Sequence, residues 1–156
     1  MGDTGEIGIK ASGMVSGYFD NEAQTASRFR DGWFYPGDLG YIREDGCLVV
    51  QGRKDEMITM NGLNIFPKEI EAVLESHPDV AFAAAFPIPS RIHGDIPVAV
   101  IELRSSRGVQ PEDVTKWANQ FLGLKTPKKI IACQKMPRNS QGKILKSELI
   151  QLFRKH

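Results

Sequence analysis

The sequence predicts an α+β fold: a small domain with a short β-sheet flanked by helices, preceded by a β-rich segment. Residues 80–86 form a nearly continuous apolar run of strand length, and residues 97–103 form a second one with β-branched residues. Such runs are typical of buried strands. After Pro67, by contrast, apolar residues recur at the spacing of one helix face, with the proline at a tolerated first-turn position.

Residues 1–54 are expected to be β-rich and without helices, because glycines are spaced there through aromatic and β-branched residues. The clearest unit is a β-hairpin. Its strands, 38–43 and 47–50, flank Glu44-Asp45-Gly46, and Asp-Gly tolerates the positive φ angles of a tight turn. Residues 1–54 are too few to close around a core of their own. They should therefore be the remnant of something larger, or pack on the rest of the chain.

Residues 55–156 are expected to form a self-contained α+β domain. From Met57 the pattern predicts the order β-α-β-β-α-β-loop-α. A second helix should begin at Pro111, a third short strand should span 129–133, and a closing helix should begin near Lys146.

The composition of the 156 residues is that of a folded globular protein, with 41% apolar and 25% charged residues. The 20 basic residues are balanced by 19 acidic ones, so there is no net positive field for a nucleic-acid backbone or an anionic membrane surface. No apolar run approaches the ~20 residues that span a bilayer, and no basic and apolar leader follows Met1. We therefore expect a cytoplasmic protein that has no transmembrane segment and binds no nucleic acid.

The cysteines and histidines indicate no metal site. Cys47 and Cys133 lie far apart and outside any C-x-x-C spacing, which favours reduced structural thiols. His77, His93 and His156 show no ligand spacing and no obvious catalytic partner.

The segment 137–146 carries the most chemical information. Lys143 is presented by a polar, glycine-containing loop after a strand, where a mobile ammonium can meet a carboxylate or phosphate oxygen as charge develops in a transition state. That arrangement suits adenylation of a carboxylate. Taken alone, the same pattern is equally well explained as an exposed basic loop that precedes the last helix.

Two further stretches bear on the chemistry. Asp38 follows Gly37 at the entry to a strand, where a carboxylate can accept hydrogen bonds from both hydroxyls of a ribose. A turn aspartate that satisfies its own backbone is the plainer alternative. The charged cluster at 53–56 lies where the β-rich pattern gives way to the α+β pattern, which is a usual position for a solvated linker.

Together, the order and spacing of these segments resemble the adenylate-forming acyl-CoA synthetases, with their luciferase and peptide-synthetase adenylation relatives. The resemblance covers nearly the whole chain and implies that residues 55–156 are the C-terminal lid domain, while residues 1–54 are the β-rich end of the large N-terminal adenylation domain. The matching blocks are Gly5–Ile9 with Gly17–Phe19, Gly37-Asp38, Gly52–Asp55, Gly62 with Pro67 and Glu69–Glu71, Gly94 with Pro97, and Pro137-Arg138 with Gly142-Lys143.

The resemblance also implies roles for single residues. Asp38 binds the ribose hydroxyls of ATP and Arg53 assists there, while Asp55 is the hinge about which the lid domain rotates. Lys143 touches the carboxylate substrate and the α-phosphate while the acyl-adenylate forms. The loop around Gly62 lines the pantetheine tunnel for coenzyme A. Rotation would let one site serve two half-reactions, acyl-AMP formation and then displacement of AMP by the CoA thiolate.

Two departures from the family pattern bear on these roles. Pro36 stands where the family usually has threonine, which removes a hydroxyl and a backbone donor from the nucleotide side. The phosphate loop ending in Pro-Lys-Gly, the acyl pocket and the Thr-Glu pair for Mg²⁺ are missing from the 156 residues. We therefore expect that the intact enzyme uses Mg²⁺ but that this chain does not bind it, and that the chain alone adenylates nothing.

The expected function is that of the C-terminal portion of an ATP-dependent, AMP-forming carboxylate–CoA ligase, completed by a large adenylation domain in cis or in trans. CoA is expected as the acceptor rather than a carrier-protein arm, because no carrier domain follows His156. The alternative is a stand-alone interaction module that binds a carrier protein or a partner synthetase without catalysis. Open apolar strand edges, including Ile7, Ile9 and Val15, could also pair with a second copy of the chain.

Overall fold

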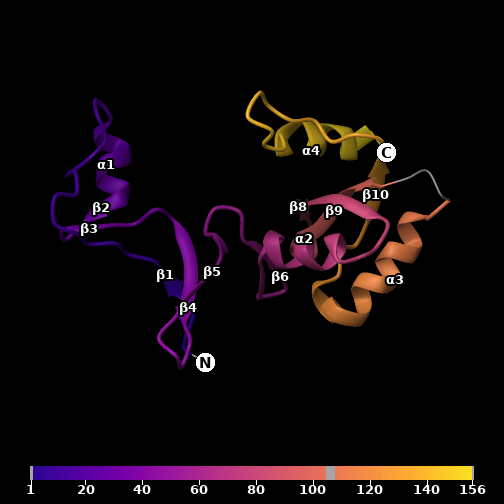
Figure 1. Ribbon diagram of the computed structural model, residues 1–156, viewed down its shortest axis with the longest axis horizontal. Coiled ribbons are helices and arrows are strands. Elements are labelled where there is room, and N and C mark those ends of the chain that lie inside the picture. The colour runs from indigo at the N-terminus through magenta and orange to yellow at the C-terminus, as the bar shows by residue number, and fades with distance from the viewer. Residues whose placement is uncertain (1, 105–107, 156) are drawn as a thin grey trace. The chain divides into compact units, whose positions relative to one another are not determined.

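The computed structural model describes residues 2–104 and 108–155, and the chain divides into two compact units (Figure 1). We call them the N-terminal unit, which runs to Asp55, and the C-terminal unit, which begins at Glu56. The described residues include both β-strands and four α-helices, so the predicted α+β class is confirmed. That residues 1–54 and 55–156 behave as separate domains stays a prediction. His156 lies outside the described residues.

The N-terminal unit is built on a three-stranded antiparallel sheet in the order β1-β4-β5. The predicted hairpin is confirmed: β4 and β5 pair antiparallel, and Arg43 N donates to Cys47 O at 2.9 Å beside the turn, where Gly46 has a φ of 82°. The strands of this unit are β1 Gly5–Glu6, β2 Phe29–Arg30, β3 Trp33–Phe34, β4 Asp38–Ile42 and β5 Leu48–Arg53, of which β2 and β3 form a separate pair.

One helix of this unit shows that the expectation of no helices in residues 1–54 was wrong. The helix α1, Glu22–Arg28, begins where the side chain of Asn21 accepts a hydrogen bond from Gln24 N at 3.0 Å. Glu22 and Arg28 place charges of the favourable sign in its first and last turns. The helix buries none of its residues, so it has no apolar stripe from which periodicity could predict it.

Among the described residues, every buried hydrophobic side chain belongs to the C-terminal unit and none to the N-terminal one. Phe19 is fully exposed, and Leu48 and Val50 of β5 are 52% and 50% exposed. Close packing in the N-terminal sheet is seen between the backbones of β4 and β5, where a Cβ at Gly40 would come within 2.4 Å of Val49 O. Apolar strand faces left open in this way need a partner surface.

The C-terminal unit is a β-sheet flanked by helices, as predicted, and the described sheet has five strands. Strand β9 is central to it: β8 pairs along β9, β10 and β6 pair with separate parts of β9, and β7 lies beside β6. The elements are β6 Ile58–Met60, β7 Leu63–Ile65, α2 Pro67–Glu75, β8 Val80–Ser90, β9 Gly94–Leu103, α3 Pro111–Leu122, a 3-10 turn Gly123–Lys125, β10 Ile130–Cys133 and α4 Lys146–Lys155. Strands β8 and β9 extend beyond the predicted runs 80–86 and 97–103.

The structure differs from the predicted element order at one place, the single strand expected from Met57. Two strands, β6 and β7, pair there through the two-residue turn Asn61-Gly62, whose φ angles are 51° and 80°. Asn-Gly is the dipeptide that best tolerates two positive φ angles in succession, as the tightest hairpin turns require. This dipeptide is the sequence signal for a hairpin that the apolar pattern did not reveal.

Alternate residues of β9 enter two separate hydrophobic cores. Ala99 and Ile101 belong to a core shared with α2 and α3, whereas Val98 and Val100 belong to a core shared with α4. Figure 1 shows α4 on the opposite side of these strands from α2 and α3. Strand β9 is therefore buried on both faces, as its continuous apolar run predicts.

The outer edge of β8 is covered by carboxylates from α2. Ala83 N donates to Glu75 Oε1, and Ala85 N donates to Glu71 Oε1, each at 3.0 Å. Backbone donors along a strand edge otherwise invite pairing with another chain. Helix α2 thus satisfies two backbone donors on the outer edge of β8.

We expect the C-terminal unit to fold without the N-terminal one. A fragment 56–156 keeps both cores and should unfold in one cooperative urea transition. In a fragment 1–55, the residues that the structure describes include no buried hydrophobic side chain, so this fragment should show no such transition. Circular dichroism against urea concentration measures both. A cooperative transition in fragment 1–55, or none in fragment 56–156, would contradict the placement of the whole core in the C-terminal unit.

Candidate functional site

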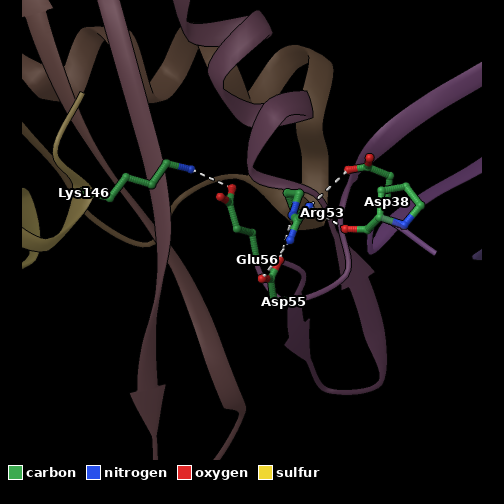
Figure 2. Close-up of polar contacts among 6 residues, drawn as sticks. Asp38, Arg53, Asp55, Glu56 and Lys146 are labelled. Atoms are coloured by element: carbon green, nitrogen blue, oxygen red, sulfur yellow. Dashed lines mark hydrogen bonds and ion pairs between the residues drawn. The ribbon is translucent and has the colours of Figure 1, made fainter. Parts of the chain in front are cut away.

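Asp38 and Arg53 face each other across the β4–β5 hairpin, because the strand register pairs these two residues (Figure 2). Arg53 Nη1 donates to Pro36 O at 2.7 Å and lies 3.9 Å from Asp38 Oδ1. Both side chains are about a third exposed, at 34% and 31%. The hairpin thus presents a guanidinium and a carboxylate together at a place that a solute can reach.

Asp55 contacts the same guanidinium (Figure 2). Arg53 Nε and Nη2 donate to its two carboxylate oxygens at 3.1 and 3.2 Å, a two-point contact that suits a planar guanidinium. Hydrogen bonds from Arg53, foremost, and its positive charge lower the pKa of the Asp55 carboxyl. Because the Asp55 side chain is 62% exposed, water screens this pair and its contribution to stability is small.

The backbone at Gly37 sets the position of Asp38. Gly37 has a φ of 88°, a region that favours glycine, and its carbonyl accepts a hydrogen bond from Lys54 N at 2.8 Å. A Cβ at Gly37 would also fall 2.0 Å from Arg28 Nη1. Both the bend of the chain and the close approach of Arg28 therefore require glycine there.

A cavity of about 360 Å³ lies beside Gly37 in the N-terminal unit. Glu6 Oε2 accepts hydrogen bonds from Lys54 Nζ at 3.0 Å and from Arg30 Nη2 at 3.2 Å, and these bonds, the one from Lys54 foremost, lower the pKa of the Glu6 carboxyl. The Arg28 guanidinium makes no hydrogen bond with another described residue. The charged lining residues are Glu6, Arg28, Arg30, Lys54 and Asp55. This lining suits a polar ligand that carries negative charge.

Gly62 lies in the turn between β6 and β7, within the C-terminal unit. Asn61 N donates to His93 O at 3.0 Å, and Asn61 Oδ1 is 3.1 Å from His93 Nδ1, so the turn is fixed to the tip between β8 and β9. A cavity of about 260 Å³, lined in part by Asn61, Leu63, His93 and Lys128, adjoins this turn. Gly62 therefore stands beside a partly apolar cavity with one lysine at its wall.

Lys143 lies in the loop between β10 and α4, also in the C-terminal unit. Arg138 and Ile144 pair across the base of the loop, and Lys143 itself is exposed. Its ammonium makes no hydrogen bond or ion pair with any other residue that the structure describes. The loop thus presents a positive charge that no side chain of the described residues neutralises.

The contacts of Lys146 were not predicted from the sequence. Lys146 Nζ donates to Glu56 Oε2 at 3.0 Å, as Figure 2 shows, and lies 3.3 Å from Glu71 Oε1. Glu56 and Lys146 are 90 positions apart in the chain, so no local pattern could indicate their contact. The first residue of the C-terminal unit is thereby tied to the start of α4.

The structure therefore joins three of the five predicted site residues, Asp38, Arg53 and Asp55, in one contact group of the N-terminal unit. Gly62 and Lys143 lie in two different loops of the C-terminal unit. No group of three or more His, Cys, Asp or Glu side chains within residues 2–104 and 108–155 could hold a metal ion. Within the same ranges, no helix has the length and apolar character needed to cross a membrane.

Comparison with known proteins places these residues in a family. Residues 69–143 match the AMP-binding enzyme C-terminal domain. The chain is 36% identical over 156 residues to 2-succinylbenzoate–CoA ligase of Geobacillus kaustophilus (strain HTA426), which covers 98% of the chain and 31% of that relative. It is 34% identical over 151 residues to peroxisomal OPC-8:0-CoA ligase 1 of Arabidopsis thaliana, which covers 96% of the chain and 28% of that relative.

A solved structure agrees with these sequence matches. The o-succinylbenzoate CoA synthetase of Bacillus subtilis, in complex with an acyl-adenylate intermediate, matches with a TM-score of 0.85 at 34% identity over 94% of the chain and 30% of that protein. The chain thus spans about 28–31% of the length of these relatives. Its sequence and its fold together show that the chain belongs to the adenylate-forming enzymes and corresponds to their C-terminal portion.

Proposed function

We propose that this chain is the C-terminal portion of an ATP-dependent, AMP-forming carboxylate–CoA ligase that acts with a large adenylation domain, supplied in cis or in trans. The observation that carries the proposal is the shared contact of Asp38, Arg53 and Asp55. The relatives support it, because two of them are named CoA ligases and a third is solved with an acyl-adenylate.

Asp38 would bind the ribose of ATP. Arg53 Nη1 bonds Pro36 O and stays 3.9 Å from the Asp38 carboxylate, which accepts no hydrogen bond from another described residue. Both carboxylate oxygens are therefore available to accept hydrogen bonds from two ribose hydroxyls. Pro36, which replaces the usual threonine, still takes part through its carbonyl, so the position of Arg53 does not depend on the lost hydroxyl.

Lys143 would act in the first half-reaction. A carboxylate oxygen of the substrate attacks the α-phosphorus of ATP, and the bond to the leaving pyrophosphate breaks, which gives acyl-AMP. Negative charge spreads over the phosphoryl oxygens in the transition state, and a positioned ammonium offsets it. An ammonium without a partner among the described residues is suited to this role, because no competing carboxylate has to be displaced first.

Asp55 and Gly62 would serve the second half-reaction, in which the CoA thiolate attacks the acyl carbonyl and AMP leaves. Asp55 is bonded to Arg53 within the N-terminal unit, and Glu56 is bonded to Lys146 within the C-terminal unit. The boundary between the two units therefore lies at a single peptide bond, the one between Asp55 and Glu56. We propose that the rotation occurs there. The exposed turn at Gly62 would then line the path of the pantetheine arm.

The chain alone should not adenylate a carboxylate, because its sequence lacks the phosphate loop and the acyl pocket. ATP and CoA are the ligands that we propose for the complete enzyme. We also propose a cytoplasmic location, with which the two free thiols, Cys47 and Cys133, are compatible.

Replacing Lys143 by alanine should abolish most acyl-adenylate formation once the chain is fused to the large domain of a relative. Loss of a single electrostatic donor at a reacting oxygen costs about 3 kcal/mol, or roughly 100-fold in rate. The conversion of chemically made acyl-AMP to acyl-CoA should largely survive, because the lysine has left the site in that step. Pyrophosphate release and acyl-CoA production measure the two half-reactions separately.

Lys116→Ala is the matched control for this experiment. Lys116 lies on α3, its side chain is 79% exposed, and its one ion-pair partner among the described residues is Asp113, one turn away. Both rates should stay unchanged in this variant. Equal losses in both half-reactions for Lys143→Ala would reject the division of labour that we assign to the lysine.

Asp55→Pro should give the converse pattern, with adenylation retained and thioester formation lost, because a fixed φ at the hinge blocks the rotation. Asp55→Ala also removes the contact with Arg53 but leaves φ free, so it should retain both half-reactions. The same two assays apply. If Asp55→Pro made acyl-CoA from acyl-AMP at the unsubstituted rate, the hinge would lie elsewhere.

We propose that the isolated chain self-associates when the large domain is absent, because apolar side chains of the N-terminal unit are then exposed. Strand β5 is an edge strand with Leu48 and Val50 half exposed. Light scattering should show a mass that rises with protein concentration, and the double variant Leu48→Lys, Val50→Lys should suppress this rise, since charges oppose pairing of edge strands. A strict monomer at high concentration would contradict the proposal.

A further inference from the structure

We propose that Asn139 and Arg138 are positioning residues for Lys143. They hold the lysine loop, residues 139–143, in the shape from which the ammonium can reach the reacting oxygens. The inference rests on the role proposed above for Lys143 in adenylation. It extends that role to two neighbours whose side chains contact the loop itself.

Asn139 organises the lysine loop through both its backbone and its side chain. Asn139 N donates to Lys143 O, and Asn139 O accepts from Gly142 N, each at 2.9 Å. Its Oδ1 accepts two more hydrogen bonds, from Gln141 N at 3.0 Å and from Lys143 N at 2.9 Å. Gly142, with a φ of 80°, lets the chain turn back on itself. Backbone groups of Gln141, Gly142 and Lys143 therefore all bond to one residue.

Arg138 fixes the same loop to the sheet. Its Nη1 donates to Gly142 O at 3.0 Å, and its guanidinium carbon lies 4.1 Å from the ring centroid of Phe82, which belongs to β8. Its Nη2 is buried without a hydrogen-bond partner among the described residues. Burying such a donor unsatisfied is unfavourable. Because one of its donors is unsatisfied, Arg138 should add little to the stability of the fold. Its contacts are better explained by a role in positioning the loop.

The geometry of the loop matters because the lysine side chain is long and flexible. Four methylene groups joined by rotatable bonds separate its ammonium from its backbone. The ammonium is therefore well placed only if the backbone of Lys143 is fixed. Without the acceptor of Asn139, the N–H groups of Gln141 and Lys143 would turn to water and the loop would adopt other turns. Misplacement of a catalytic group by about 1 Å can cost about 100-fold in rate.

A purely structural role for Asn139 would have different consequences. The lysine loop leads into α4, whose Leu149 is fully buried in the core below that helix. If Asn139 only helped α4 to pack, its loss would lower thermal stability and slow both half-reactions alike. Loss of positioning would slow adenylation and leave the thioester step intact.

The test compares four variants of the full chain, fused to the large domain of the Geobacillus kaustophilus relative: Asn139→Ala, Asn139→Asp, Ser140→Ala and Lys143→Ala. Asn139→Ala should lower kcat for adenylation about tenfold or more, with KM for ATP and the thioester step within about twofold. Asn139→Asp keeps an acceptor oxygen at the same place and should recover most of the rate. Ser140→Ala is the matched control: Ser140 is an exposed neighbour in the loop whose side chain makes no hydrogen bond with another described residue.

A second measurement needs no activity. In the full 156-residue chain, amide hydrogen exchange at Gln141 and Lys143 should speed up about tenfold in Asn139→Ala and stay unchanged in Ser140→Ala. The amide of Leu149, which donates to Leu145 O in α4, is the internal reference and should not change.

The outcomes separate this inference from the proposed function. If Lys143→Ala stops adenylation while Asn139→Ala does not, the positioning role is rejected and the proposed function stands. If Lys143→Ala leaves adenylation intact, the proposed function fails and the positioning role fails with it. Equal losses in both half-reactions for Asn139→Ala, with faster exchange at Leu149, would make the residue structural and would also overturn the inference.

Discussion

The burial of β9 on both of its faces is the constraint on which the C-terminal unit depends. Ala99 and Ile101 supply one core to α2 and α3, while Val98 and Val100 supply another to α4. Neither layer of helices could bury its apolar face without this strand. The loops that leave the sheet can then vary in sequence without loss of the core, and the residues with proposed chemical roles in this unit lie on such loops.

The N-terminal unit is organised differently, because it has no buried hydrophobic side chain among the described residues. Its best-defined polar feature is the Arg53 guanidinium, which reaches Pro36 O, Asp38 and Asp55. Exposed ion pairs of this kind add little stability. The arrangement therefore contributes little to the folding of residues 2–55 alone, and it is consistent with the ligand role proposed above for Asp38.

Lys146 connects two features of the C-terminal unit that the proposed mechanism requires to move together. It lies directly after the segment that carries Lys143, and it binds Glu56, the residue that follows the proposed hinge. Glu71, which also satisfies the edge of β8, lies 3.3 Å from the same ammonium. A rotation at Asp55 would therefore carry the lysine loop with the sheet as one body, which is a condition for precise placement of a catalytic group.

The sequence by itself determined α2, α3 and the central strands β8 and β9, because the apolar pattern of a helix face or a buried strand is contained in about ten consecutive residues. Through a family resemblance it also indicated Asp38, Arg53, Asp55, Gly62 and Lys143 as candidates. Its apolar pattern did not reveal α1, which has no apolar stripe, or the separation of β6 from β7, for which the Asn61-Gly62 dipeptide is the only sequence signal. Only the tertiary structure decided the contacts of Arg53 with Pro36, Arg138 with Phe82 and Lys146 with Glu56. These contacts join positions distant in the chain, and strand register and helix packing, rather than any local pattern, determine which side chains meet.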